Sequence, residues 1–202
     1  WWETAIGLTS TITDDYYREQ SLSHLSIALA KVAQEQADRS LFDRALAHAN
    51  EIKGYSTNRM QALTENSLQM AELGVRLGQM DWFDQSLEVV DLITESNQDE
   101  RSVPIHLIAR KMAETGSKQQ EVEWFQRGLE ITRHNTDRYV QFYNAKDMPD
   151  GMQDTLTVTL KLAFEMVLAD PTSNSIAELL KTSFKMVLLD SDQSEVASTL
   201  LA

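Results

Sequence analysis

Histidine side chains are the first candidates for chemistry in this sequence, because a neutral imidazole can bind a metal ion or carry a proton. The chain has four of them, at His24, His48, His106 and His134. They are scattered over different predicted helices, which argues against the close pairing of a histidine with a second histidine or a carboxylate that a helical metal site needs. We therefore expect no metal site.

Other catalytic groups are no better organised. The chain has no cysteine, which excludes disulfides, thiolate metal sites and cysteine nucleophiles. Carboxylates are numerous, but a general acid and base need one pair desolvated in a pocket, and no such pair stands out. Serine and threonine occur without a nucleophile-elbow or phosphate-loop pattern. We therefore expect neither an enzyme nor a cofactor.

Charge and hydropathy narrow the possible partners. A formal net charge of −13 opposes binding to a phosphate backbone, so we expect no nucleic-acid partner. No apolar run of about 18 residues is present to cross a membrane, so we expect no membrane insertion. The absence of cysteine is compatible with the cytoplasm, where we expect the protein to lie. The first residues lack Met and a signal pattern, which suggests an excised domain or a processed chain. An acidic surface fits basic or mixed-charge protein partners.

The elements that would carry any binding residues are helices, since 7 glycines and 3 prolines favour long helices with short connections. Small residues recur in pairs twelve positions apart, and two antiparallel helices need such residues where they cross closely. The pairs are Ala33 and Ala45, Gly74 and Ser86, and Gly116 and Gly128. Large residues recur in register with them, namely Leu29, Met70 and Met112, and Phe42, Phe83 and Phe125.

The clearest copy of this pattern resembles the tetratricopeptide repeat family. The matching residues are Met70, Leu73, Gly74, Leu77, Ser86, Val90 and Ile93. The period here is 40 to 42 residues rather than the family's 34, and about two added helical turns in the first helix would account for the difference. The resemblance implies an all-α, right-handed α-solenoid of antiparallel helix pairs with a period of about 41. HEAT-type repeats share the longer period and remain a rival.

The repeat pattern also predicts where the helices lie. Trp2, Ala5 and Ile6 match Phe42, Ala45 and Leu46, so residues 1–12 read as the second helix of an incomplete repeat. The predicted first helices are 18–35, 59–78 and a third that starts near Pro104 with Ser102 as its N-cap and ends near Thr115. The predicted second helices are 41–52, one that closes near Ile93, and 120–134. Residues 14–17 are predicted as a connection, Gly54 as a helix C-cap, and Thr57 or Asn58 as an N-cap.

Two regions follow from this organisation. Residues 1–147 form the predicted tetratricopeptide-like repeats, and residues 139–151, ending Met-Pro-Asp-Gly, carry the boundary signal. Residues 148–202 form a predicted helical region in which 160–170 recurs as 180–190, and these helices would continue the stack. Arginines recur at the start of successive units, where we expect each to brace a connection by bonding carbonyl groups or a nearby acid. These are Arg18, Arg59, Arg101 and Arg138.

The resemblance further implies a partner-binding groove on the concave face formed by the first helix of each unit. Its residues, carried over by spacing, are Ile27, Ala30, Gln34 and Asp38, then Leu68, Ala71, Val75 and Gln79, then Arg110, Ala113, Ser117 and Glu121. The family's carboxylate clamp uses Lys, Arg and Asn there, and only Arg110 fits. On the opposite, convex side, Asp43, Arg44, Glu88 and Asp91 are expected to face solvent.

The function implied is therefore protein binding, with three versions left open. The leading hypothesis is a scaffold or adaptor that holds a protein or peptide segment in the groove. The second is a secretion or assembly chaperone that shields an apolar partner segment. The third is the regulatory helical-repeat domain of a larger enzyme or sensor. The oligomeric state cannot be read from the sequence.

Overall fold

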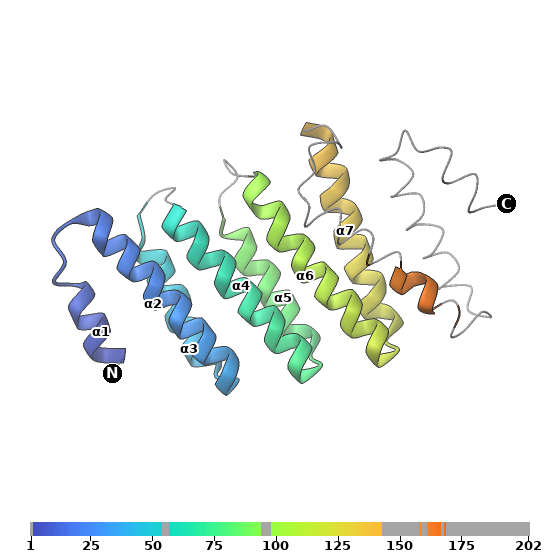
Figure 1. The fold of residues 1–202 in the computed structure, drawn as a ribbon, viewed down its shortest axis with the longest axis horizontal. Coiled ribbons are helices and arrows are strands. Elements are labelled where there is room, and N and C mark those ends of the chain that lie inside the picture. The colour runs from blue at the N-terminus through green and yellow to red at the C-terminus, as the bar shows by residue number, and fades with distance from the viewer. Residues whose placement is uncertain are drawn as a thin grey trace. The chain divides into compact units, whose positions relative to one another are not determined.

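A computed structural model describes residues 2–53, 57–93, 98–142, 158, 161–166 and 168. Regular structure in these residues is helical, without a strand, which confirms the all-α class (Figure 1). The chain divides into two compact units, Trp1–Pro104 and Ile105–Ala202, which we describe separately. No helix in the described part of the chain combines the length and the apolar character needed to span a membrane.

Unit 1 is built from helices in two layers. Its helices are α1 (Trp2–Thr9), α2 (Asp15–Gln36), α3 (Arg39–Glu51), α4 (Thr57–Leu77) and α5 (Met80–Asp91), followed by the start of α6 (Gln98–Gln119). Helices α2 and α4 lie side by side, α3 packs on α2, and α5 packs on α4 (Figure 1). The α2–α3 and α4–α5 pairs are therefore equivalent helix pairs, as the recurring small residues predict.

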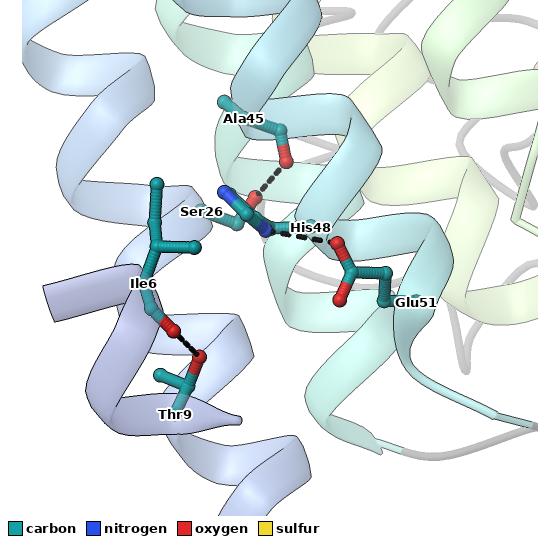
Figure 2. Close-up of polar contacts among 6 residues, drawn as sticks. All are labelled: Ile6, Thr9, Ser26, Ala45, His48 and Glu51. Atoms are coloured by element: carbon teal, nitrogen blue, oxygen red, sulfur yellow. Dashed lines mark hydrogen bonds and ion pairs between the residues drawn. The ribbon is translucent and has the colours of Figure 1, made fainter. Parts of the chain in front are cut away.

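The two pairs cross at equivalent positions. In the first pair the hydroxyl of Ser26 on α2 donates to the carbonyl oxygen of Ala45 on α3 at 2.7 Å (Figure 2). In the second pair the direction reverses, because the hydroxyl of Ser86 on α5 donates to the carbonyl of Ser67 on α4, also at 2.7 Å. Ser26, Ala45, Ser67 and Ser86 are all fully buried. Only small side chains let the two backbones approach closely enough for these bonds.

Glycine has a packing role two turns further along α4. A Cβ atom built on Gly74 would lie 3.0 Å from the ring of Phe83 on α5. Phe83 itself is fully buried, so its ring occupies the space that the missing side chain leaves. The contacts of Gly74 with Phe83 and of Ser67 with Ser86 run in opposite directions along the two helices, which makes the pair antiparallel.

The ends of α2, α3 and α4 differ from the sequence prediction by one to three residues. The Asp14 carboxylate accepts a hydrogen bond from the Tyr17 amide, so α2 begins at Asp15, and residues 15–17 are helical rather than a connection. Helix α4 begins at Thr57, which places both predicted caps, Thr57 and Asn58, inside the helix. It ends before Gly78, whose φ of 62° is the left-handed conformation that glycine adopts at helix ends. Gly54 lies outside the described residues.

Helices α6 and α7 (Val122–Phe142) correct three further predictions. Pro104 lies inside α6, and Ser102 is a buried helical residue rather than an N-cap. A proline inside a helix costs about 3 kcal/mol, and burial of the Pro104 ring offsets part of that cost. Helix α6 also runs past Thr115, and α7 continues beyond His134, so residues 139–142 are helical rather than part of a boundary.

Unit 2 repeats the close helix crossing with glycine on both helices. A Cβ atom on Gly128 would lie 2.6 Å from the carbonyl oxygen of Ala109, and one on Gly116 would lie 2.7 Å from the amide nitrogen of Phe125. Both contacts are with backbone atoms of the facing helix, so α6 and α7 are closer here than side chains would allow. Residues 161–166 are helical, as predicted for the first 20-residue copy, and Ala163 and Met166 are buried. The copy at 180–190 lies outside the described residues.

Two of the four recurring arginines brace helix ends. Arg59, in the first turn of α4, donates to the carbonyl of Leu92 and to the side-chain oxygen of Asn50, each at 3.1 Å. Arg101 forms an ion pair with Asp91 at the end of α5. Arg18 pairs with Asp15 inside its own helix instead of reaching a preceding one. The side chain of Arg138 lies outside the described residues.

The second helices also contact each other between pairs. Trp82 on α5 is 7% exposed, its ring lies 5.5 Å from that of Phe42 on α3, and the guanidinium of Arg39 lies over it at 5.2 Å. Outside this contact the predicted solvent-facing acids, Asp43, Glu88 and Asp91, are exposed. The remaining predicted residue, Arg44, is half-buried and pairs with Glu3 of α1 at 2.6 Å.

Candidate functional site

The predicted binding residues of unit 1 gather on the outer face of α2 and α4. Ile27 and Gln34 lie on α2, Leu68 and Val75 lie on α4, and all four are half-buried. Ile27 shares the outer stripe of α2 with the exposed residues His24 and Lys31, which are one helical turn away on either side. We call Ile27, Gln34, Leu68 and Val75 the first-helix face.

A buried chain of hydrogen bonds holds α2 and α4 together beneath this face. The amide nitrogen of the Asn66 side chain donates to the Ser26 hydroxyl at 2.8 Å and to the carbonyl of Ala62 at 2.7 Å. The Ser26 hydroxyl in turn donates to the carbonyl of Ala45, so one chain of bonds links α4, α2 and α3. Asn66 is fully buried. Polar groups at such a site favour one alignment of the helices, because any slip leaves donors and acceptors without partners.

A second link lies at the C-terminal end of α2. The guanidinium of Arg76 on α4 donates to the carbonyl of Glu35 at 3.0 Å and also to the carbonyl of Gln34. The last carbonyls of a helix have no hydrogen-bond partner within the helix and carry partial negative charge. A cationic side chain there donates the missing hydrogen bonds and balances the charge. Two sets of hydrogen bonds join α2 to α4, the buried bonds of Asn66 and the bonds of Arg76 at the end of α2. Together they fix the positions of Gln34 and Val75 relative to each other.

Three predicted site residues lie at the connections between paired helices. Asp38 is the N-cap of α3, and its carboxylate accepts from the Ser40 hydroxyl at 2.7 Å and the Ser40 amide at 2.8 Å. These bonds, the hydroxyl bond first, lower the pKa of the Asp38 carboxyl. Gln79 is the N-cap of α5 without a side-chain bond, and Glu121 is exposed before α7. Asp38 therefore has a structural role, and the other two remain available.

Unit 2 supplies two predicted residues on α6. The Arg110 side chain donates from Nε to the carboxylate of Glu114 at 2.8 Å, and both side chains are about one-third exposed. Ser117 is half-buried two turns further along. Because its Nε already binds a carboxylate, Arg110 presents a partly neutralised cation, which weakens the case for a carboxylate clamp further.

The alanines predicted for the groove are not on a surface. Ala30, Ala71 and Ala113 are each 0% exposed. The reason is visible at Ala113, because a Cβ on Gly128 of α7 would approach both its amide nitrogen and its Cβ to about 3 Å. Ala113 therefore faces the second helix of its own pair, and none of the three buried alanines can touch a partner.

The four histidines lie on four different helices. No group of three or more His, Cys, Asp or Glu side chains that could hold a metal ion occurs among the described residues. The sequence prediction overlooked one close pair, since Nδ1 of the buried His48 lies 3.1 Å from the carboxylate of Glu51, three residues on (Figure 2). In unit 2, Nδ1 of the fully buried His106 lies 2.5 Å from the side-chain amide of Asn135. Both pairs satisfy buried polar groups within the fold.

No protein-family model matches the chain, and no curated protein matches it either.

Proposed function

We propose that the chain is a protein-binding module whose helix pairs stack as a right-handed, tetratricopeptide-like α-solenoid with a period of about 41 residues. In this proposal the first-helix face holds a segment of a partner protein, as in a scaffold or adaptor. The equivalent crossings at Ser26 with Ala45 and at Ser67 with Ser86 support the repeat.

One observation carries the binding proposal. Two first helices pack side by side and leave aliphatic side chains, Ile27, Leu68 and Val75, half-exposed on the face that they share. The outer side of α5, by contrast, exposes carboxylates such as Asp81 and Glu88. Partner-binding surfaces combine apolar anchors with polar groups that orient the ligand. The first-helix face has both, whereas the exposed residues of α5 are all acids, beside the half-buried Leu87.

The bound segment would be short and anchored by a few side chains. Ile27 and Leu68 occupy equivalent positions on neighbouring helices, and Gln34 and Val75 occupy the equivalent positions two turns further on. An extended or helical peptide can place two or three apolar side chains on such a face while Gln34 and Gln79 donate or accept hydrogen bonds. Because α2 and α4 are bonded rigidly, little ordering cost remains on this side of the interface.

We expect Val75→Glu to raise the dissociation constant of such a segment by roughly tenfold or more, because it places a charge where an apolar side chain docks. Val75 is half-exposed, so the melting temperature should change little. The measurement is isothermal titration of a peptide selected from a displayed library against the native chain. Glu88→Lys, on exposed α5 surface, is the control and should bind as the native chain does.

If Glu88→Lys abolishes binding while Val75→Glu leaves it intact, the partner docks on the second helices and the proposed face is wrong.

A further inference from the structure

Helices α2 and α4 run in the same direction, with equivalent residues side by side (Figure 1). Two bonds at different heights of their contact show this alignment. Asn66 of α4 bonds Ser26 of α2, 40 positions away, and Arg76 of α4 bonds the carbonyl of Glu35 on α2, 41 positions away. A residue on the outer side of α2 therefore lies level with the residue about 41 positions later on α4.

The charged side chains around the aliphatic residues of this face differ between the two helices. In the same order along each helix, the outer residues are His24, Ile27 and Lys31 on α2, and Glu65, Leu68 and Glu72 on α4. Over these three levels α2 combines its aliphatic residue with a histidine and a lysine, whereas α4 combines its own with two carboxylates. We call these two sets the α2 column and the α4 column.

Part of this charge is not used inside the fold. Lys31 is exposed and Glu65 is half-buried, and neither forms an ion pair among the described residues. Charges of opposite sign are therefore available on the two columns, beside the aliphatic side chains of Ile27 and Leu68. Charged groups around an apolar contact select among ligands and fix their orientation more than they add affinity.

We propose that the segment bound on this part of the first-helix face is an amphipathic helix with acidic side chains along one flank of its apolar stripe and basic side chains along the other. This inference rests on the proposed function and names the chemistry of its partner. The apolar stripe covers Ile27 and Leu68. The acidic flank faces Lys31 on the α2 column, and the basic flank faces Glu65 on the α4 column.

The spacing within each column favours a helix over an extended segment. The two polar residues of a column are seven positions apart, which is about two helical turns. A helix that lies along α2 and α4 has the same rise per residue, so its own residues seven positions apart meet both levels from one flank. Successive side chains of an extended segment point to opposite faces and do not form two flanks with a stripe between them.

The opposite charges of the columns also fix the direction of the bound helix. Turning a helix end for end, while its apolar stripe stays on the face, exchanges its two flanks. Only one of the two directions then places the acidic flank on the α2 column and the basic flank on the α4 column. A surface with the same charge on both columns would accept either direction equally.

The test uses a fluorescein-labelled synthetic peptide of three heptads, with leucines in the stripe, glutamates on one flank, lysines on the other and alanines elsewhere. In fluorescence anisotropy with the full chain, it should bind saturably. Lys31→Glu should weaken this binding about threefold or more, because it turns an attraction into a repulsion. Lys53→Glu, at an exposed residue after α3, changes the net charge equally and is the matched control, which should bind as the native chain does. Both lysines are exposed, so neither variant should lose helical circular dichroism.

A second peptide with lysines on both flanks should respond in the opposite sense. Because Lys31→Glu makes both columns acidic, this peptide should bind that variant more tightly than it binds Lys53→Glu. An equal response of either peptide to the two variants would overturn the proposal. If Val75→Glu weakens the binding while Lys31→Glu does not, the charged flanks are wrong and the proposed function stands. If neither peptide binds, the proposal is also wrong, and the proposed function fails with it only when the library-selected peptide ignores Val75→Glu as well.

Energy transfer reports the direction of the bound helix. The chain has no cysteine, so Thr57→Cys at the exposed start of α4, or Gln36→Cys at the exposed end of α2, carries a single acceptor dye. These two residues lie at opposite ends of the aligned helices. A donor at the amino end of the first peptide should transfer energy to one of them, and exchanging the two flanks of the peptide should shift the transfer to the other. Equal transfer to both, or transfer that the exchange leaves unchanged, would overturn the fixed direction.

Discussion

Gly128→Ala is expected to destabilise unit 2 by at least about 2 kcal/mol. The added methyl group would lie 2.6 Å from the carbonyl oxygen of Ala109 and about 3 Å from Ala113, so α6 and α7 must move apart. Backbone atoms cannot rotate away as a flexible side chain can, and the helix-propensity gain of about 1 kcal/mol for Ala over Gly is too small to compensate.

Two other glycines provide controls of the same substitution. At Gly7 nothing lies within 4 Å of the added methyl group, so Gly7→Ala should stabilise α1 slightly through propensity alone. At Gly74 the nearest atoms belong to the Phe83 ring at 3.0 Å, and Gly74→Ala should fall between the other two variants. Urea denaturation, monitored by circular dichroism, ranks the free energies of unfolding of the three variants. A Gly128→Ala variant as stable as Gly7→Ala would mean that α6 and α7 do not cross at this residue.

Asn66→Asp is expected to cost about 3 to 5 kcal/mol at pH 7, although the two side chains have the same shape. The substitution replaces the two N–H donors, to Ser26 and to the carbonyl of Ala62, with a carboxylate oxygen that repels both acceptors. The other oxygen gains nothing, because Oδ1 of Asn66 is buried without a hydrogen-bond partner among the described residues. A fully buried charge without a partner is among the most destabilising changes a fold can receive.

The loss of stability in Asn66→Asp should grow as the pH rises. Burial raises the pKa of the introduced carboxyl above its unfolded value near 4. Between these two values the folded state binds more protons than the unfolded state, so the variant loses stability as pH rises, by up to roughly 1.4 kcal/mol per pH unit. Urea denaturation at several pH values measures this slope, with Gln61→Glu, on exposed α4 surface, as the control. A loss that is equal at pH 4 and pH 7 would show that the lost donors, rather than the charge, dominate.

The helix pairs could be predicted because two helices whose backbones cross closely need small residues at the crossing, and small residues can be recognised in a sequence. Ala45, Ser86 and Gly128 have different chemistry, yet each is small enough for the facing helix to approach closely, and their spacing reveals the pairs. The hydrogen bonds that join one helix pair to the next could not be predicted from residue size. Asn66 read as an ordinary polar helix residue, because its partner Ser26 lies 40 positions away and bonds at that separation have no local signature.

Errors at helix ends and in the site have separate causes. Pro104 was placed in a first turn because an interior proline is costly, and the buried surroundings that offset the cost are tertiary. The outer positions Ile27, Leu68 and Val75 do lie on the side of their helices with partial exposure. Ala30, Ala71 and Ala113 were placed with them by spacing alone. A usable signal existed, since each alanine directly follows a large residue of the buried stripe, such as Met70 before Ala71.

The bonds from Arg76 have a consequence for how this surface can evolve. Arg76 binds the carbonyl groups of residues 34 and 35, which every amino acid supplies, and takes nothing from their side chains. Substitutions at Gln34 or Glu35 would therefore leave the joint between α2 and α4 intact. Residues on the first-helix face can then change while Arg76, Asn66 and Ser26 beneath them keep their bonds. In such a chain, variation among descendants would concentrate on the outer stripe of the first helices and spare the residues that join them.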